Sequence, residues 1–343
     1  KGVEVEHRNL LNVYHWEKRE FPHDGPYNAC QTASICFDAS VREFWSYLPD
    51  GATLYFVPRE TILQPEELVK WLCDNSIEDA FFPTPVFETI LDLEWPEHCA
   101  LKNLYLGGDR LTRYIPPDFP CHAINFYGPA ECTIESTFAV YEPGEIDGPG
   151  YPHIGHPIGN AHIYILDKNS KLVPIGQDGE IYVGGAGVGR GYANNPTLTA
   201  GSYIKNPLPE DIPDQVLYKT GDLGRFRQDG KIEFIGRNDF QVKIRGLRIE
   251  LSEIEAVLNR HIDVLRSAVT VFDEGENIKF LAAYVVLKQE NPEIKVELKE
   301  LATDTLPDYM VPTFITVLDR MPLTKNGKID RKKLKYGQIK AAF

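Results

Sequence analysis

Three absences in the sequence narrow the class of protein. No run of apolar residues approaches the roughly 18 that a membrane-spanning helix needs. The first residues, KGVEVEHRNLL, form neither a signal peptide nor a transit peptide. The six cysteines include no CxxC pair, and a chain of 343 residues can build its core without disulfides. We therefore expect a soluble, cytoplasmic protein with reduced thiols and no membrane partner.

Positive charge is also scarce. Lysine and arginine total 36 against 50 aspartates and glutamates, which gives a net charge of −14, and no long basic run occurs before the C-terminal end. This balance argues against a nucleic-acid partner, so any phosphate ligand must be bound by local groups. The glycine-rich stretch GGAGVGRGY at 184–192 fits neither GxGxxG nor GxxxxGK[ST]. Taken alone, it predicts a tight turn between strands.

The apolar content is sufficient for one large core or two smaller ones. The chain has 343 residues, of which 43% are hydrophobic. In the first third, helical windows alternate with short apolar runs such as 53–57 and 80–82, which predicts α/β layers. Closely spaced strands then follow at 162–167, 179–185 and 231–236, with Gly, Pro and Asp turns between them. This second part reads as a distorted β-barrel or sheet.

A third pattern begins near the C-terminal end of this region. An alternating strand at 241–246 is followed by a helix, two strands, and a second helix near 295–306. Together they predict a small α+β unit of roughly a hundred residues. We therefore predict an α/β protein with two domains: a multi-layer large subdomain at 1–238, and a small α+β subdomain at 239–343.

Several residues suit a nucleotide or a metal ion, although each has a simpler explanation. In YKTGD, Asp222 could accept hydrogen bonds from a ribose diol, but Gly-Asp is a common turn. In INFYGPAECT, Tyr127 could stack on a base and Glu131 could bind a hard cation, but one such loop is more often structural. In LTKNGKIDRKKL, Lys328 could face a phosphate or belong to a solvated tail.

The order and spacing of these motifs carry more information than any one of them. Seven motifs occur in sequence: FDAS at 37–40, NFYGPAE at 125–131, GEIYVGGAGVGRGYANNPTLT at 179–199, YKTGDL at 218–223, GRNDFQVKIRGLRIELSEIE at 236–255, LPDYMVP at 306–312 and NGKIDR at 326–331. In this order they resemble the core motifs of nonribosomal peptide synthetase adenylation domains, which belong to the ANL adenylate-forming superfamily. The sequence starts with Lys-Gly-Val, the end of that family's phosphate loop, so we expect the loop and the N-terminal part to lie outside it.

The resemblance implies a role for each residue of the nucleotide site. Tyr127 would stack on the adenine with Asn125 beside its edge, and Asp222 would hold the ribose hydroxyls. Arg237 would contact ribose or phosphate. Glu131 would bind Mg²⁺, whose charge neutralises the triphosphate of ATP in an otherwise acidic protein.

The resemblance also implies two half-reactions. In the first, Lys328 would reach the substrate carboxylate and the α-phosphate as aminoacyl-AMP forms and pyrophosphate leaves. The small domain would then rotate about a hinge at Asp239 and bring Lys243 to the site. The phosphopantetheine thiol of a peptidyl carrier domain would then attack the adenylate. Other synthetase domains and a small MbtH-like helper protein are the further partners that the family suggests.

The residues that would bind the amino acid come from the same comparison. Asp38 would pair with the substrate α-ammonium. The other lining residues would be Ala39, Arg42, Phe81, Tyr105, Gly107, Phe126, Ile134 and Glu135. A buried charge needs a partner, so three outcomes are open. If Arg42 contacts the substrate, an acidic substrate side chain is expected. If Glu135 contacts the substrate, a cationic side chain is expected. If Arg42 and Glu135 pair with each other, a neutral side chain is expected. The sequence slightly favours a short polar or acidic side chain.

Two alternatives to this function remain at the level of sequence. An acyl-CoA ligase of the same superfamily would share the fold and the adenylation step, but Asp38 argues against it because acyl substrates carry no amine. A noncatalytic fragment is the other alternative, and the sequence's start after the phosphate loop supports it. Lys328, Asp222 and Glu131 favour an enzyme.

Overall fold

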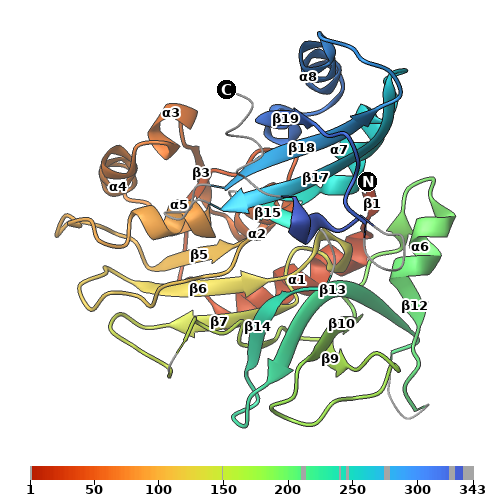
Figure 1. Ribbon diagram of the computed structural model, residues 1–343. Coiled ribbons are helices and arrows are strands. Elements are labelled where there is room, and N and C mark those ends of the chain that lie inside the picture. Colours follow the sequence, from red (N-terminus) through yellow and green to blue (C-terminus); the bar gives the residue numbers. More distant parts are fainter. Residues whose placement is uncertain are drawn as a thin grey trace. The chain divides into compact units, whose positions relative to one another are not determined.

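A computed structural model describes residues 2–148, 150–209, 214–238, 241–244, 247–273, 279–323 and 329–334 (Figure 1). The chain divides into two compact units, Lys1–Asp239 and Phe240–Phe343. The movement of the second unit as a separate domain stays a prediction. The α/β class with a small α+β unit is confirmed by the arrangement of helices and strands given below.

A mixed seven-stranded sheet forms the first half of the larger unit. Its strands are β2 (Asn28–Gln31), β3 (Thr53–Phe56), β4 (Asp79–Pro83), β5 (Asn103–Gly107), β6 (His122–Tyr127), β7 (Thr137–Tyr141) and β8 (His156–Pro157). They lie in the order β3-β2-β4-β5-β6-β7-β8. The pairs from β3 to β6 are parallel, and β7 and β8 add antiparallel. Central strands such as β5 are buried on both faces, as expected for parallel strands covered by helices.

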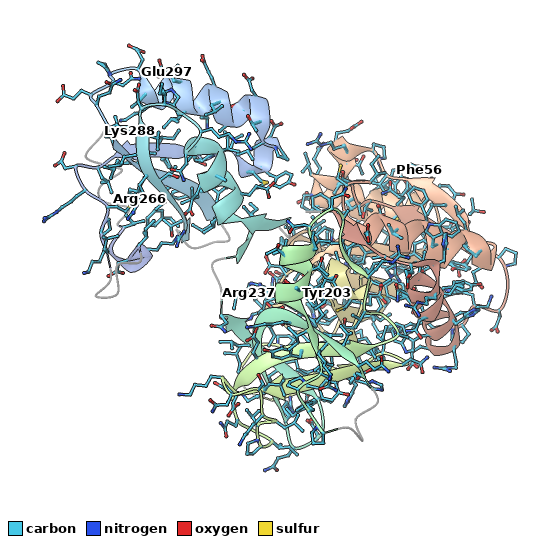
Figure 2. The ribbon with its side chains drawn as sticks, turned by 90° about the vertical axis from the view of Figure 1, so that its right-hand side faces the viewer. Phe56, Tyr203, Arg237, Arg266, Lys288 and Glu297 are labelled. Carbon is cyan, nitrogen blue, oxygen red and sulfur yellow. The ribbon has the colours of Figure 1, made fainter. Side chains whose placement is uncertain are left out.

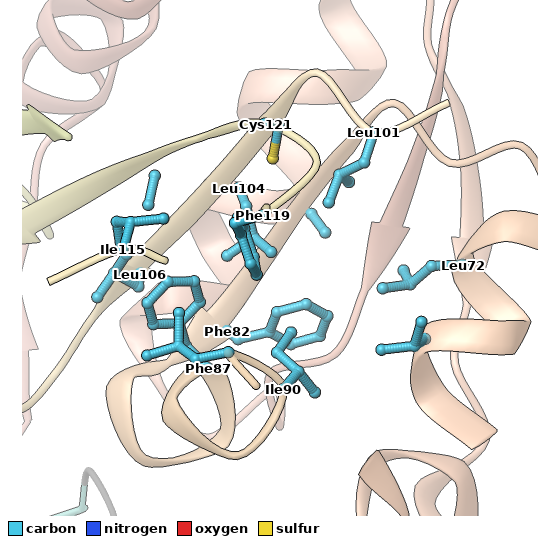
Figure 3. Close-up of a cluster of buried hydrophobic side chains, with 14 of the residues drawn as sticks. Leu72, Phe82, Phe87, Ile90, Leu101, Leu104, Leu106, Ile115, Phe119 and Cys121 are labelled. Atoms are coloured by element: carbon cyan, nitrogen blue, oxygen red, sulfur yellow. The ribbon is translucent and has the colours of Figure 1, made fainter. Parts of the chain in front are cut away.

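Helices accompany this sheet in sequence. They are α1 (His7–Glu20), α2 (Asp38–Tyr47), α3 (Arg59–Ile62), α4 (Pro65–Asp74) and α5 (Thr84–Thr89), with a 3₁₀ turn, η1 (Leu48–Asp50), after α2. Side chains alternate between the two faces of a strand. Phe82 and Leu104 therefore join the large core with Leu72 of α4 and Phe87 of α5 (Figure 3). Their neighbour Phe81 points to the opposite face and packs in a second cluster with residues of α1.

The second half of the larger unit is mostly antiparallel sheet. Its strands are β9 (Ala161–Leu166), β10 (Gly179–Gly185), β12 (Tyr203–Lys205), β13 (Val216–Phe226) and β14 (Ile232–Arg237), in the order β12-β13-β10-β9 with β14 on β13. A short pair, β1 (Val3–Glu4) with β11 (Gly191–Tyr192), ties the start of the chain to the glycine-rich stretch. The helix α6 (Pro196–Ser202) follows, and η2 (Ala130–Cys132) interrupts the loop after β6.

The structure corrects the expectation that Asp222 lies in a turn. It lies inside β13, where the four steps from Lys219 to Leu223 oppose only two steps on β10, so the strand bulges. Gly221 has φ +75° in this bulge, which favours a residue without Cβ. A bulge re-aims the side chain that it carries, and here that side chain is Asp222.

The smaller unit has its own sheet and core. Its strands are the hairpin β15 (Gln241–Ile244) and β16 (Leu247–Glu250), and the sheet β17 (Val264–Asp273), β18 (Lys279–Leu287) and β19 (Phe314–Val317). Its helices are α7 (Leu251–Leu258) and α8 (Ile294–Thr305), with 3₁₀ turns η3 (Asp308–Met310) and η4 (Arg331–Lys333). Helix α8 carries Glu297, labelled in Figure 2. Throughout the described ranges, no helix combines the length and apolar character that crossing a bilayer requires.

Candidate nucleotide and amino-acid site

Several of the predicted site residues lie on the parallel strands or just after their carboxyl ends. In open α/β sheets ligands bind at this edge, because the loops there converge. Asp38 and Ala39 open α2, which follows β2, and Phe81 lies on β4. Tyr105 and Gly107 lie on β5. Asn125, Phe126 and Tyr127 end β6.

The loop after β6 is tightly folded. Thr133 and Ile134 both have left-handed backbone, with φ +62° and +70°. A Cβ atom on Gly128 would overlap the carbonyl oxygen of Ile134 and lie 2.8 Å from the Cα atom of Glu135, so the loop closes on a position that only glycine fits. The fold of this loop buries the two carboxyl side chains that it carries, Glu131 and Glu135.

We expect Gly128→Ala to destabilise the larger unit by about 2 kcal/mol, because the backbone at Ile134 must move to admit the methyl group. Urea unfolding measures the change. Gly201→Ala on α6 is the matched control, since a Cβ there meets nothing within 4 Å. Equal effects of the two substitutions would contradict the tight closure of the loop.

Tyr127, Asp222 and Arg237 come together. The Tyr127 hydroxyl donates to Asp222 Oδ2 over 2.7 Å, and Arg237 Nη1 lies 2.5 Å from Asp222 Oδ1. Arg237, labelled in Figure 2, is the cross-strand partner of Asp222 and also donates to the Thr220 carbonyl. Burial, and then the Asp222 charge, hold the pKa of Tyr127 well above its usual range, so its hydroxyl stays a donor. The carboxylate of Asp222 is therefore fixed from two sides.

Asn125 lies two residues before Tyr127 and thus on the same side of β6. Its side chain is 2% exposed, and its amide nitrogen donates to the His153 carbonyl oxygen over 3.2 Å. The structure therefore places Asn125 near Tyr127 in the same strand, with its orientation set by the backbone of His153.

The carboxylate of Glu131 is held by Tyr192 of β11. The Tyr192 hydroxyl donates to Glu131 Oε1 over 2.6 Å and lies 3.3 Å from the Tyr218 hydroxyl. Glu131 is 3% exposed, and the amide of Gly189 donates to its backbone oxygen. A carboxylate oxygen is the ligand type that Mg²⁺ prefers, and one or two carboxylates suffice when phosphates complete the shell. Glu131 therefore fits the expected ion, and Tyr192, which the sequence analysis missed, orients it.

Arg42 and Glu135 are in contact. Arg42 is fully buried, with Nε 2.9 Å from Glu135 Oε1. Its Nη2 pairs with Glu17 of α1, and Nη1 donates to the Tyr47 hydroxyl over 2.9 Å. The guanidinium carbon lies 3.9 Å from the centroid of the Tyr105 ring. It also lies within reach of the aromatic rings of Phe81 and Phe126, at 5.9 and 5.3 Å.

These contacts shift the ionisation of the group. Burial first, and then the Glu17 carboxylate, raise the pKa of Glu135 to about 8, although Arg42 opposes them. Burial also raises the pKa of Glu17. Burial acts to lower the pKa of Arg42, but Glu17 and its other neighbours outweigh it, so the guanidinium stays charged.

Glu17 is a further residue of this cluster that the motifs did not indicate. A signal was present, because Asn9, Val13, Trp16 and Glu17 follow helical spacing and are the buried residues of α1. A glutamate on the buried face of a helix requires a cation or a hydrogen-bond donor. Arg42 is that cation.

Three predicted residues cannot be placed in the site. Lys328 and the hinge residue Asp239 lie outside the described residues. Lys243 lies on β15, where it pairs with Arg248 of β16, but its side chain is outside the described part of the chain. Their roles stay predictions.

A second cluster of titratable side chains lies in the smaller unit. Ligand atoms of His261, Asp263 and Glu297 fall within 4.8 Å of one another. However, the two oxygens of Asp263 already accept hydrogen bonds from Gln289 and Asn291, at 2.6 and 2.9 Å. This group is therefore a hydrogen-bonded network that braces the end of β18.

Known proteins share the sequence and the fold. Residues 1–193 match the family model of AMP-binding enzymes, and residues 253–328 match the AMP-binding enzyme C-terminal domain. A linear gramicidin synthase of Brevibacillus parabrevis is 45% identical over 337 residues, which are 97% of this chain and 6% of that protein. Bacitracin synthase 1 of Bacillus licheniformis is 39% identical over 335 residues, which are 97% of this chain and 6% of that protein. The chain thus spans only a small part of the length of these relatives.

Two solved structures extend the likeness. Holo-PA1221, a protein containing adenylation and PCP domains, has a TM-score of 0.71 at 27% identity, covering 90% of this chain and 53% of that one. The fold of the adenylation domain AlmE from Vibrio cholerae, solved with glycyl-adenosine-5'-phosphate, matches with a TM-score of 0.80 at 24% identity, covering 99% and 63%. The resemblance drawn from the motifs is thus confirmed, and the chain belongs to the family of AMP-binding enzymes.

Proposed function

We propose that the chain activates an amino acid as its aminoacyl adenylate, using ATP and Mg²⁺, within a nonribosomal peptide synthetase. The observation that carries the proposal is the Asp222 carboxylate, fixed by Tyr127 and Arg237 beside the loop that carries Glu131. The similarity to gramicidin and bacitracin synthases supports the same chemistry.

The first half-reaction joins the amino-acid carboxylate to the α-phosphorus of ATP, and the bond to pyrophosphate breaks. Asp222 would accept hydrogen bonds from the ribose hydroxyls, because its oxygens retain lone pairs beyond those used by Tyr127 and Arg237. Glu131 would hold Mg²⁺, whose charge neutralises the phosphates. Asp38, partly exposed at the start of α2, would pair with the α-ammonium of the amino acid.

The second half-reaction would pass the aminoacyl group to a carrier domain. In this part of the proposal, Lys328 acts in adenylation, Asp239 is the hinge, and Lys243 acts when the phosphopantetheine thiol attacks. It rests on the family motifs, and the adenylation and PCP domains of holo-PA1221 support a carrier partner. Other synthetase domains, an MbtH-like helper and a cytoplasmic location belong to the same proposal.

Amino-acid-dependent ATP–pyrophosphate exchange tests the first half-reaction in the full-length natural protein. The panel contains the common amino acids with several fatty and aryl acids. We expect exchange with one amino acid or a few, and a loss of about 100-fold in Asp222→Asn, which removes charge at the ribose. Asp178→Asn, an exposed carboxylate on the same half of the unit, is the control. Exchange with fatty or aryl acids alone would indicate an acyl-CoA ligase, and exchange with nothing by a folded protein would contradict the proposal.

Tyr192→Phe tests how Glu131 is held. We expect the Mg²⁺ concentration for half-maximal exchange to rise about tenfold, because groups that orient a metal ligand typically change affinity by that order. Tyr164→Phe is the matched control, since it removes a 2.6 Å hydrogen bond to Asp214 instead. An equal Mg²⁺ dependence in both variants would show that Tyr192 does not orient Glu131.

A further inference from the structure

The buried cluster around Arg42 leaves one of its own members unsatisfied. Arg42 uses Nη2 on Glu17 and Nη1 on Tyr47, and its planar face covers Tyr105. Each terminal nitrogen of the guanidinium therefore has one partner, and Nε lies 2.9 Å from Glu135 Oε1. Glu135 is different: apart from the Arg42 contact, neither of its oxygens accepts a hydrogen bond within the described residues.

The cluster also contains more acidic groups than basic ones. One guanidinium faces two carboxyl groups, Glu17 and Glu135, each less than a tenth exposed. Glu17 has the better set of contacts, because Ser46 Oγ donates to its second oxygen over 2.5 Å. The group that still needs a proton or a donor is Glu135.

We propose that Glu135, and not Arg42, contacts the side chain of the bound amino acid. The preferred side chain donates a hydrogen bond and carries no carboxylate. Glu17 is the positioning residue, because it fixes Arg42 and leaves Glu135 available. This inference rests on the proposed function. It names the substrate class of the same site.

Glu17 determines which pocket residue is available. It lies on α1 and enters the cluster from outside the lining set transferred from the family. By fixing Nη2, it prevents Arg42 from turning its fork toward a substrate carboxylate. An acidic side chain would instead meet two carboxyl groups that already share the Arg42 guanidinium. Of the short polar and acidic side chains that the sequence favours, the proposal therefore excludes the acidic ones.

Two kinds of donor satisfy Glu135. A hydroxyl or carboxamide could bond to it while it keeps its proton, which agrees with the raised pKa of Glu135. An ammonium could bond to it in the ionised form and balance the second carboxylate. The shared chemistry is a donor at the end of the side chain.

Isosteric substrate pairs test the proposal by pyrophosphate exchange in the full-length protein. The pairs are asparagine with aspartate, glutamine with glutamate, and threonine with valine, and ornithine and lysine are added for the ammonium donor. We expect the donor member of at least one pair, or an ammonium substrate, to exchange at least tenfold faster than acidic and apolar members. Glu135→Met should abolish the preference for the donor over its apolar isostere, and Glu135→Gln, which keeps an acceptor, should retain it.

The positioning role of Glu17 is measured by the ratio of the exchange rates with the two members of a substrate pair. Glu17→Gln should lower the discrimination against the acidic member by about tenfold with an unchanged KM for ATP, because Arg42 is released. Glu20→Gln, an exposed glutamate on the same helix, is the control and should change nothing. If Glu17→Gln does not fold, Ser46→Ala should cause a smaller shift in the same direction, since it loosens Glu17 without removing it.

The outcomes separate this inference from the proposed function. Exchange confined to acidic or to purely apolar amino acids would overturn the inference and leave adenylation standing. Unchanged ratios in folded Glu17→Gln or Ser46→Ala would refute the positioning role. Exchange with no amino acid at all would instead refute the proposed function.

Discussion

Arg42→Met is expected to lower the free energy of unfolding of the larger unit by about 4 kcal/mol, since removing one partner of a buried ion pair costs about 3–5 kcal/mol. Glu17 and Glu135 would be left buried without the guanidinium that they share. The aromatic rings of Tyr105 and Phe126 would also lose the guanidinium that lies over them. Urea unfolding at neutral pH measures the change.

Two comparison variants separate charge from packing. The triple variant Glu17→Gln, Arg42→Met, Glu135→Gln should recover most of the stability, because neutral groups of similar volume replace the guanidinium and both carboxyl groups. Lys18→Met removes the ion pair with Asp50, in which Lys18 is half exposed, and should cost less than about 1 kcal/mol. If Arg42→Met cost no more than Lys18→Met, the buried cluster would not stabilise the fold as described.

The sequence was informative where local pattern decides structure. The strand expected at 179–185 is β10 with the same bounds, and the helix expected near 295–306 is α8. The motif around Tyr127 correctly predicted that several of the candidate residues lie at one loop, because residues close in sequence also lie close in space. Family order then linked this loop to Asp222 and Arg237, which the structure joins by hydrogen bonds and an ion pair.

The sequence failed where long-range register decides. A Gly-Asp pair can form a turn or a bulge, and only the pairing of β13 with β10 distinguishes them. Tyr192 meets Glu131 because two segments 61 residues apart close on each other. The sequence named Arg42 and Glu135 as candidates, but not Glu17, on which the proposed substrate class depends and whose place comes from the packing of α1 against α2. Helical periodicity could have marked Glu17 as buried, but not its partner.

The stability of the wild-type chain should fall relative to that of Glu135→Gln as pH rises from about 5 to about 8. The pKa of Glu135 is about 8 in the folded protein, against 4.5 ordinarily, because of burial and the nearby Glu17. Between these values the unfolded chain has lost the proton and the folded chain still binds it. The folded state therefore binds more protons, and the free energy of unfolding decreases with pH by up to about 1.4 kcal/mol per unit. Above the folded pKa the loss is complete.

Urea unfolding of both proteins at several pH values measures this difference. Arg42 and Asp38 also act on Glu135, and they are present in both proteins, as is Glu17 with its own raised pKa. Their contributions to the difference in the free energy of unfolding cancel to first order. The remaining change of this difference with pH therefore belongs to position 135. We expect a gap that grows by about 3 kcal/mol over this range. A gap that stayed constant would mean that Glu135 is ionised at every pH tested, so that its contact with Arg42 outweighs burial and the charge of Glu17.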